Sequence, residues 1–278
     1  MGKEIYITMK EDLSKYNPEG STLRKAQLRM LDMLIEIDKI CRKHKIDYWI
    51  EFGTLLGAIR HKGFIPWDDD VDICVMDKDY NHLREVLQRE LPEQFVFQDT
   101  STDKYAFFDY GRVRDKHSYC YYPYFTKLKE QGLWIDIFRY SPIATPKLVK
   151  PIDFIYRRVY REMHHFGDVA YPSQFRIWKN RIIAYLVYPC VKVAKVCLEY
   201  IGESNKTSLF VCWAFPRIIR EYQIFFPLTE VEFEGHKFLA PNKWHEHLTR
   251  TYGDYMKIPS EEKRRRNINM DTVKIWNE

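Results

Sequence analysis

Four aspartates fall within five positions of this chain, and this cluster constrains the fold more than any other feature. They are Asp68, Asp69, Asp70 and Asp72, placed directly before and within the β-prone segment 71–76 (VDICVM). Neighbouring carboxylates repel one another and are costly to bury unless a metal ion or protein cations offset their charge. Alternate residues of a strand share a face, so Asp70 and Asp72 are predicted to project on the same side. The alternative is a solvated turn or a helix cap.

A second informative position is Asp136, in the middle of the apolar segment 133–138 (LWIDIF). A carboxylate among Trp, Ile and Phe needs a paired cation or several hydrogen-bond donors. Two acids on one strand and a third on a neighbouring strand form a site of hard oxygen ligands, which suits Mg²⁺ or Mn²⁺. We therefore predict Asp70, Asp72 and Asp136 as catalytic residues and metal ligands, with Asp68 as an additional candidate ligand. Asp136 is also the candidate general base.

The predicted metal site implies a phosphate-bearing substrate. Magnesium in proteins keeps water and substrate phosphates among its ligands, so we expect a nucleotide or another diphosphate. Gly53 and Thr54 precede a predicted helix, and backbone amides at a helix N-terminus are suited to bind a phosphate. Basic side chains would neutralise charge that develops on a leaving group. The candidates are Arg60, Lys62, Arg112 and Arg114.

The hydrophobic pattern predicts alternating helices and short strands in the first half of the chain. Helices are expected over 22–45, 55–60 and 79–91, and strands over 47–52, 71–76, 95–98, 106–114 and 133–138. This order favours an α/β (α+β) protein in which a small mixed sheet is flanked by helices. We predict a core over 1–144 and a helical, basic C-terminal region over 145–278, packed together as one compact unit.

Composition excludes several classes of protein. With 45% apolar and 30% charged residues the chain is typical of a globular protein, and a formal charge of +5 is too small to indicate a nucleic-acid partner. The six cysteines form no CxxC motif and the N-terminus has no apolar signal core, so we expect reduced thiols in a cytoplasmic protein. His245 and His247 lack the spacing of an HExxH zinc site, and we expect them on the surface.

The segment 147–220 is helical by pattern and strongly basic, with thirteen Lys and Arg residues against five acids. Within it, 182–201 is mostly apolar but is interrupted by Pro189, Lys192 and Lys195. Two structures fit this pattern, an amphipathic helix on an anionic membrane surface and a core helix with a solvated basic side. Peripheral membrane contact through 147–220 is therefore one of two open predictions.

The segment 53–73 (GTLLGAIRHKGFIPWDDDVDI) resembles the signature of the LicD family of phosphocholine-type transferases. Further segments resemble later blocks of the family in the same order: 107–118 (FFDYGRVRDKHS), 132–138 (GLWIDIF), 233–241 (FEGHKFLAP) and 247–259 (HLTRTYGDYMKIP). The resemblance implies a nucleotidyltransferase-like fold, related to the fukutin-type proteins, and leaves out only a variable stretch near 145–225. This sequence differs in having Phe52 where many members have Gly, and Thr54 in place of the common Ser.

By this resemblance, Gly53-Thr54 is the glycine turn of the fold, Asp70 and Asp72 are its acid pair, and Asp136 is its third acid. The implied reaction starts from a CDP-activated alcohol such as CDP-choline. A glycan hydroxyl, deprotonated towards Asp136, attacks the distal phosphorus, and CMP leaves. The implied acceptor is a surface (capsule) polysaccharide or a lipopolysaccharide precursor. Two alternatives stay open: a DxD-type glycosyltransferase using a nucleotide sugar and Mn²⁺, and a relative that binds nucleotide or glycan without turnover.

Overall fold

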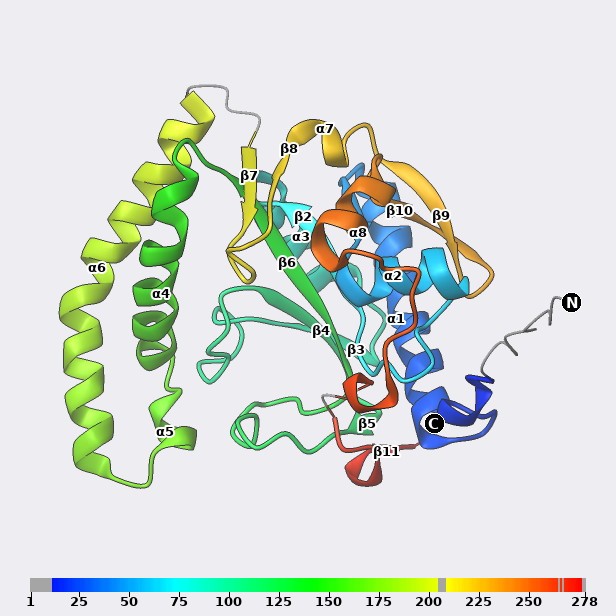
Figure 1. The fold of residues 1–278 in the computed structure, drawn as a ribbon. Coiled ribbons are helices and arrows are strands. Elements are labelled where there is room, and N and C mark those ends of the chain that lie inside the picture. Colours follow the sequence, from blue (N-terminus) through cyan, green and yellow to red (C-terminus); the bar gives the residue numbers. More distant parts are fainter. Residues whose placement is uncertain (1–11, 205–208, 265, 267, 277–278) are drawn as a thin grey trace, which may run out of the picture.

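The computed structural model describes residues 12–204, 209–264, 266 and 268–276. Within these residues seven strands form a mixed sheet: β1 (Tyr48–Ile50), β2 (Asp72–Met76), β3 (Phe95–Gln98), β4 (Gly111–Asp115), β6 (Trp134–Pro142), β7 (Leu209–Cys212) and β8 (Ile219–Glu221). The order is β1-β2-β6-β4-β3, and β7 and β8 join through the second half of β6 (Figure 1). β2 and β6 run parallel, and the other neighbouring strands are antiparallel.

The register of the three central strands places polar residues side by side. Asp72 on β2 pairs with Asp136 on β6, and Asp136 pairs with Arg112 on β4. A parallel pair needs a crossover connection, and here α3 (Asp77–Glu90), β3 and β4 supply it. The sheet therefore joins the two acidic segments that the sequence keeps far apart.

Helices lie on both sides of the sheet. α1 (Thr22–His44) is capped by Ser21, whose hydroxyl accepts a hydrogen bond from the amide of Arg24. The apolar side of α1 is buried together with α2 (Phe52–His61) and α3. α4 (Pro146–Met163) and α6 (Gln174–Ser204) pack against each other and are joined by α5 (Gly167–Ala170). Figure 1 shows the central strands between this helix pair and α1.

The C-terminal part of the chain packs beside the sheet, on the side of α2. It contains α7 (Tyr222–Phe225), a hairpin of β9 (Thr229–Phe233) and β10 (His236–Ala240), and α8 (Trp244–Tyr252). The hairpin turns at Glu234 and Gly235, both with positive φ. Shorter elements are the pair β5 (Ser118–Tyr119) and β11 (Lys274–Ile275) and the 3-10 turns Ser14–Tyr16, Glu261–Lys263 and Met270–Thr272. Of the helices described, none combines the length and the apolar character that crossing a bilayer requires.

The predicted mixed α/β fold is confirmed, with differences at the ends of elements. α2 begins at Phe52, three residues earlier than predicted, because the carbonyl of Glu51 already accepts the amide of Leu55 (3.1 Å). The strand predicted over 106–114 begins only at Gly111, since the pairing with β6 starts there and the pairing with β3 covers residues 112–115. The division of the chain into a core over 1–144 and a C-terminal region over 145–278 stays a prediction.

Candidate active site

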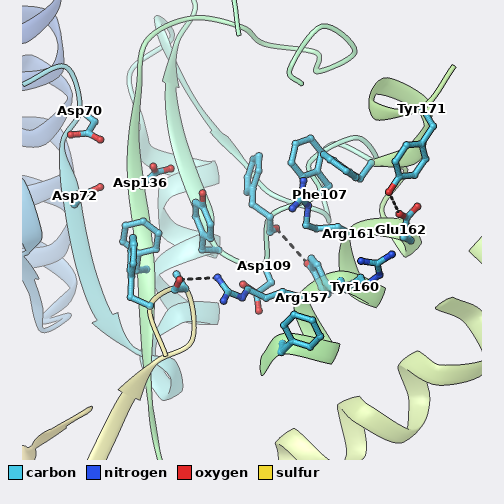
Figure 2. Close-up of a pocket in the computed structure, with 18 residues that line it drawn as sticks. Asp70, Asp72, Phe107, Asp109, Asp136, Arg157, Tyr160, Arg161, Glu162 and Tyr171 are labelled. Carbon is cyan, nitrogen blue, oxygen red and sulfur yellow. Dashed lines mark hydrogen bonds between the residues drawn. The ribbon is translucent and has the colours of Figure 1, made fainter. Parts of the chain in front are cut away.

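Asp72 and Asp136 lie next to each other because β2 and β6 pair in parallel. The amide of Asp136 donates to the carbonyl of Val71 (3.0 Å), and the amide of Asp72 donates to Thr54 Oγ1 (2.9 Å). Thr54 is buried in the first turn of α2, so this turn helps to position the strand that carries Asp72. Asp70, just before β2, lines the same pocket as the other two acids (Figure 2).

Asp68, Asp69 and Asp70 form a group just before β2, with one carboxylate oxygen of each within 4.8 Å of the others. Asp69 also accepts a hydrogen bond from the amide of Ile268 (2.6 Å). Asp68 lies against Gly53, where a Cβ atom would stand 2.6 Å from Asp68 Oδ2. Glycine at position 53 therefore allows this carboxylate to approach the first turn of α2.

The neighbouring acids raise the pKa of Asp72 and of Asp68. Burial raises the pKa of Asp72 well above its ordinary value, and the charges of Asp70, Asp136 and Asp68 raise it further. Burial also raises the pKa of Asp68, together with the charges of Asp70 and Asp69. A divalent cation would relieve this repulsion, and carboxylate oxygens are the ligands that Mg²⁺ and Mn²⁺ prefer. Both Asp68–Asp70 and the predicted set Asp70, Asp72 and Asp136 therefore offer carboxylates to an ion, and which of them bind metal stays a prediction.

Each carboxylate oxygen of Asp136 accepts a hydrogen bond. Arg112 Nε donates to Oδ1 (2.5 Å), and Trp134 Nε1 donates to Oδ2 (3.2 Å). Arg112 Nη2 donates to the hydroxyl of Tyr110 (3.1 Å), and the guanidinium lies over the ring of Phe108, 4.3 Å from its centroid. The acid among apolar residues thus has the paired cation that its burial requires.

Arg112 and its neighbour on the same face, Arg114, are both built into the sheet. Arg114 Nε donates to Gln98 Oε1 (2.6 Å) and Nη1 to the carbonyl of Gly132 (2.8 Å), while burial and the charge of Arg112 lower the pKa of Arg114. Arg112 Nη1 and Arg114 Nη2 are buried and have no hydrogen-bond partner among the described residues. Their predicted contact with phosphate stays a prediction.

The remaining predicted phosphate ligands lie around α2. Arg60 Nη1 donates to the carbonyl of Tyr255 (2.9 Å), and Lys62 is exposed at the C-terminal end of the helix. Neither is among the described residues that line the pocket with the acids. Gly53 and Thr54 lie in the first turn of α2, where helix geometry leaves backbone amides without a partner in the helix.

Phe52, the first residue of α2, has a left-handed backbone conformation with φ 48°. This region favours glycine and costs other residues roughly 1–2 kcal/mol. The side chain of Phe52 is buried against Phe138 and Phe215, with ring centroids 5.5 and 4.5 Å apart. Because both partners line the pocket, this departure from the glycine of the family signature affects the pocket wall.

A cavity of about 590 Å³ opens between the acids and α4 (Figure 2). The three predicted acids line one side, and Arg157, Arg158 and Arg161 line the other. Sequence reasoning missed these arginines, because it interpreted the basic segment as a solvent or membrane surface. The available signal was the spacing of Arg157 and Arg161, which puts them on one face of a helix.

Aromatic side chains form much of the remaining wall. They are Phe107, Phe108, Tyr110, Phe138, Phe154, Tyr160, Phe166, Tyr171 and Phe215. Arg161 lies over the ring of Phe166, 3.6 Å from its centroid, and Glu162 accepts a hydrogen bond from the hydroxyl of Tyr171 (2.7 Å). Cations, acids and aromatic faces together suit a ligand that carries both negative and positive charge.

His247 is buried, so its predicted surface position is wrong. Arg220 Nε donates to Nδ1 (3.1 Å), so Nε2 carries the ring proton and donates it to Glu51. Trp49 Nε1 donates to the other carboxylate oxygen of Glu51 (2.6 Å). The amide of Glu51 donates to the carbonyl of Asp72 (3.0 Å). This network ties α8 to the strand of the acid pair, a long-range contact that no local pattern reveals.

Comparison with known proteins shows the class of protein. Residues 45–166 match the family model described as LicD/FKTN/FKRP, nucleotidyltransferase domain. The lipopolysaccharide cholinephosphotransferase LicD of Haemophilus influenzae is 32% identical over 261 residues, which are 87% of this chain and 94% of that protein. The ribitol 5-phosphate transferases FKRP of Mus musculus and Homo sapiens are each 44% identical over 41 residues, 15% of this chain and 8% of theirs. This chain belongs to the LicD family and is a transferase.

Proposed function

We propose that this protein transfers a phospho-alcohol group, phosphocholine or a close analogue, from a CDP-activated donor to a hydroxyl of a cell-surface glycan. The observation that carries the proposal is the pocket in which the acids of β2 and β6 face the arginines of α4. The relative in Haemophilus influenzae is named a lipopolysaccharide cholinephosphotransferase, which supports a lipopolysaccharide precursor as the acceptor. A capsule polysaccharide is a second candidate acceptor of the same chemistry.

The donor's diphosphate would lie between the two charged walls of the pocket. A Mg²⁺ or Mn²⁺ ion held by Asp70, Asp72 and Asp136 would neutralise the diphosphate and the charge on the departing CMP. From the opposite wall, Arg158 and Arg161 would pair with phosphate oxygens. The amides of the first turn of α2 remain a further candidate phosphate contact.

The aromatic wall supports a cationic alcohol such as choline. A quaternary ammonium group is attracted to the faces of aromatic rings, and Phe107 and Tyr110 offer such faces within the pocket. Asp109 and Glu162 line the same region and add negative charge (Figure 2). The diphosphate of such a donor therefore suits the charged walls of the pocket, and its cationic alcohol suits the aromatic wall.

In the proposed reaction the acceptor hydroxyl forms a bond to the distal phosphorus, and the bond from that phosphorus to the CMP oxygen breaks. The hydroxyl proton passes to Asp136. Each oxygen of this carboxylate already accepts one hydrogen bond, so one further lone pair on each oxygen remains for the proton or for a metal ion. Arg112 and Trp134 hold the carboxylate in a fixed orientation for this step.

The test is release of CMP by the purified protein with Mg²⁺, CDP-choline and candidate glycans. Asp70→Asn and Asp136→Asn should abolish release, whereas the same change at the exposed Asp271 should leave it unchanged. The rival, a DxD-type glycosyltransferase, predicts release of UDP or GDP from a nucleotide sugar. Cleavage of nucleotide sugars alone would overturn the proposal.

We also propose that the reaction takes place in the cytoplasm, at the inner face of the membrane. The six cysteines are free in the structure, which supports a reducing compartment. A lipid-linked glycan precursor would give segment 147–220 a reason to contact the membrane.

A further inference from the structure

Helix α6 exposes an apolar face on the outer side of the molecule. Figure 1 shows α6 outermost, with α4 between it and the sheet. Its inner face packs on α4 and includes the buried residues Ile177, Ala184 and Leu198. A helix with apolar residues on all sides is normally buried on all sides. Here only the inner side is covered within the described part of the chain.

Six of the exposed apolar residues of α6 recur at helical intervals and form one stripe. They are Phe175, Trp178, Ile182, Leu186, Val193 and Tyr200, which we call the α6 stripe. Phe175 and Leu186 expose 70% and 72% of their surface. At 1.5 Å per residue the stripe is about 38 Å long. Single exposed apolar residues need no explanation, but a contiguous surface of this kind marks an interaction site.

The net charge around the stripe is positive. α6 contains five Lys and Arg residues, all within 174–198, and two acids, Glu199 and Glu203, near its C-terminal end. Two of the five are in ion pairs within the chain. The other three, Arg176, Lys179 and Lys192, are exposed at or beside the stripe. An apolar, aromatic face with basic flanks is typical of a helix that lies in the interface of an anionic membrane.

We propose that the α6 stripe docks on the surface of an anionic lipid bilayer, with the helix axis in the plane of the membrane. The apolar and aromatic side chains enter the boundary between headgroups and acyl chains, and the basic side chains contact lipid phosphates. A second copy of the chain fits less well, because two α6 helices would bring together faces of the same net positive charge. Anionic lipid supplies the opposite charge.

Docking in this way leaves the pocket near the bilayer. The cavity lies on the far side of α4 from α6, so two helix layers, about 20 Å, separate it from the stripe. The sugar of a lipid-linked acceptor would reach across this distance. That consequence rests on the proposed function, whereas docking itself does not.

The test measures co-sedimentation of the protein with vesicles of phosphatidylcholine, with and without phosphatidylglycerol. The wild type should bind the vesicles that contain phosphatidylglycerol, less so as salt is raised. The double variant Leu186→Glu/Val193→Glu should lower the partition coefficient at least about tenfold. Met256→Glu makes the same kind of change at an exposed apolar residue outside α6 and should bind as the wild type does.

Trp178 provides a second readout that reports on the stripe itself. Brominated lipid in the vesicles should quench part of the tryptophan emission, and the quenched part should disappear in Trp178→Phe. Release of CMP with a soluble acceptor should be unchanged in all these variants, so failure of docking and failure of the proposed function are distinguishable. The inference is overturned if the wild type does not bind, if the double variant binds equally well, or if light scattering shows a dimer that the double variant abolishes.

Discussion

Replacing Asp72 with asparagine separates the stability of the acid site from its activity. Asp72 is buried, and its surroundings raise its pKa through burial first and then through the charges of Asp70, Asp136, Asp68 and Glu51. At neutral pH and without a divalent cation, keeping this carboxylate ionised therefore costs stability. Asparagine has nearly the same shape and no charge, so it removes that cost.

The sign of the effect follows from the raised pKa. An acid whose pKa is higher in the folded state favours folding below its unfolded value, near 4, and this contribution is lost as pH rises through the folded value. One pKa unit corresponds to about 1.4 kcal/mol. We therefore expect Asp72→Asn to raise the free energy of unfolding by about 1–3 kcal/mol at pH 7.5, and by less at pH 4.

The assay is thermal or urea unfolding in a metal chelator, repeated with Mg²⁺ or Mn²⁺. For a chain of this size each 1 kcal/mol corresponds to about 2–4 °C in Tm. Added metal should stabilise the wild type and leave Asp72→Asn unchanged, and the variant should release no CMP. Asp271→Asn, an exposed control, should behave as the wild type does. A variant that is less stable than the wild type in chelator at pH 7.5 would refute the reasoning.

Three further sets of substitutions test other parts of the site. Phe52→Gly should be more stable than Phe52→Ala by about 1 kcal/mol, the reverse of the usual helix order, because only glycine relieves the left-handed φ; equal urea midpoints would contradict this. Arg158→Gln and Arg161→Gln should each raise the donor KM about tenfold, and an unchanged KM would remove them from the donor site. His247→Ala should lower the free energy of unfolding by about 3 kcal/mol, since it leaves the carboxylate of Glu51 buried without this donor; an unchanged urea midpoint would show otherwise.

Local patterns in the sequence were enough to predict the strands that carry the acids. Segments 71–76 and 133–138 are mostly apolar, and each forms a strand that begins one residue later than predicted. β2 ends where predicted, and β6 continues four residues further. The ion-pair partner of Asp136 could not be predicted, because it depends on the register of β4 against β6. That register turns Arg112 into the ion-pair partner of the buried acid. Register is a property of strand pairing over distance, and no local periodicity contains it.

The pocket arginines of α4 could not be predicted from segment 147–220 for a physical reason of the same kind. The charge count correctly showed that the segment is basic. A charge count does not show which side of a helix faces the pocket and which faces solvent. α4 places Arg157 and Arg161 in the lining of the pocket that the acids also line, whereas α6 exposes apolar residues on its outer side. The match to the family model ends at residue 166, directly after α4. The two proposals give α4 a part in the chemistry and α6 a part in membrane docking, and a loss of vesicle binding without a loss of CMP release is the result that this division requires.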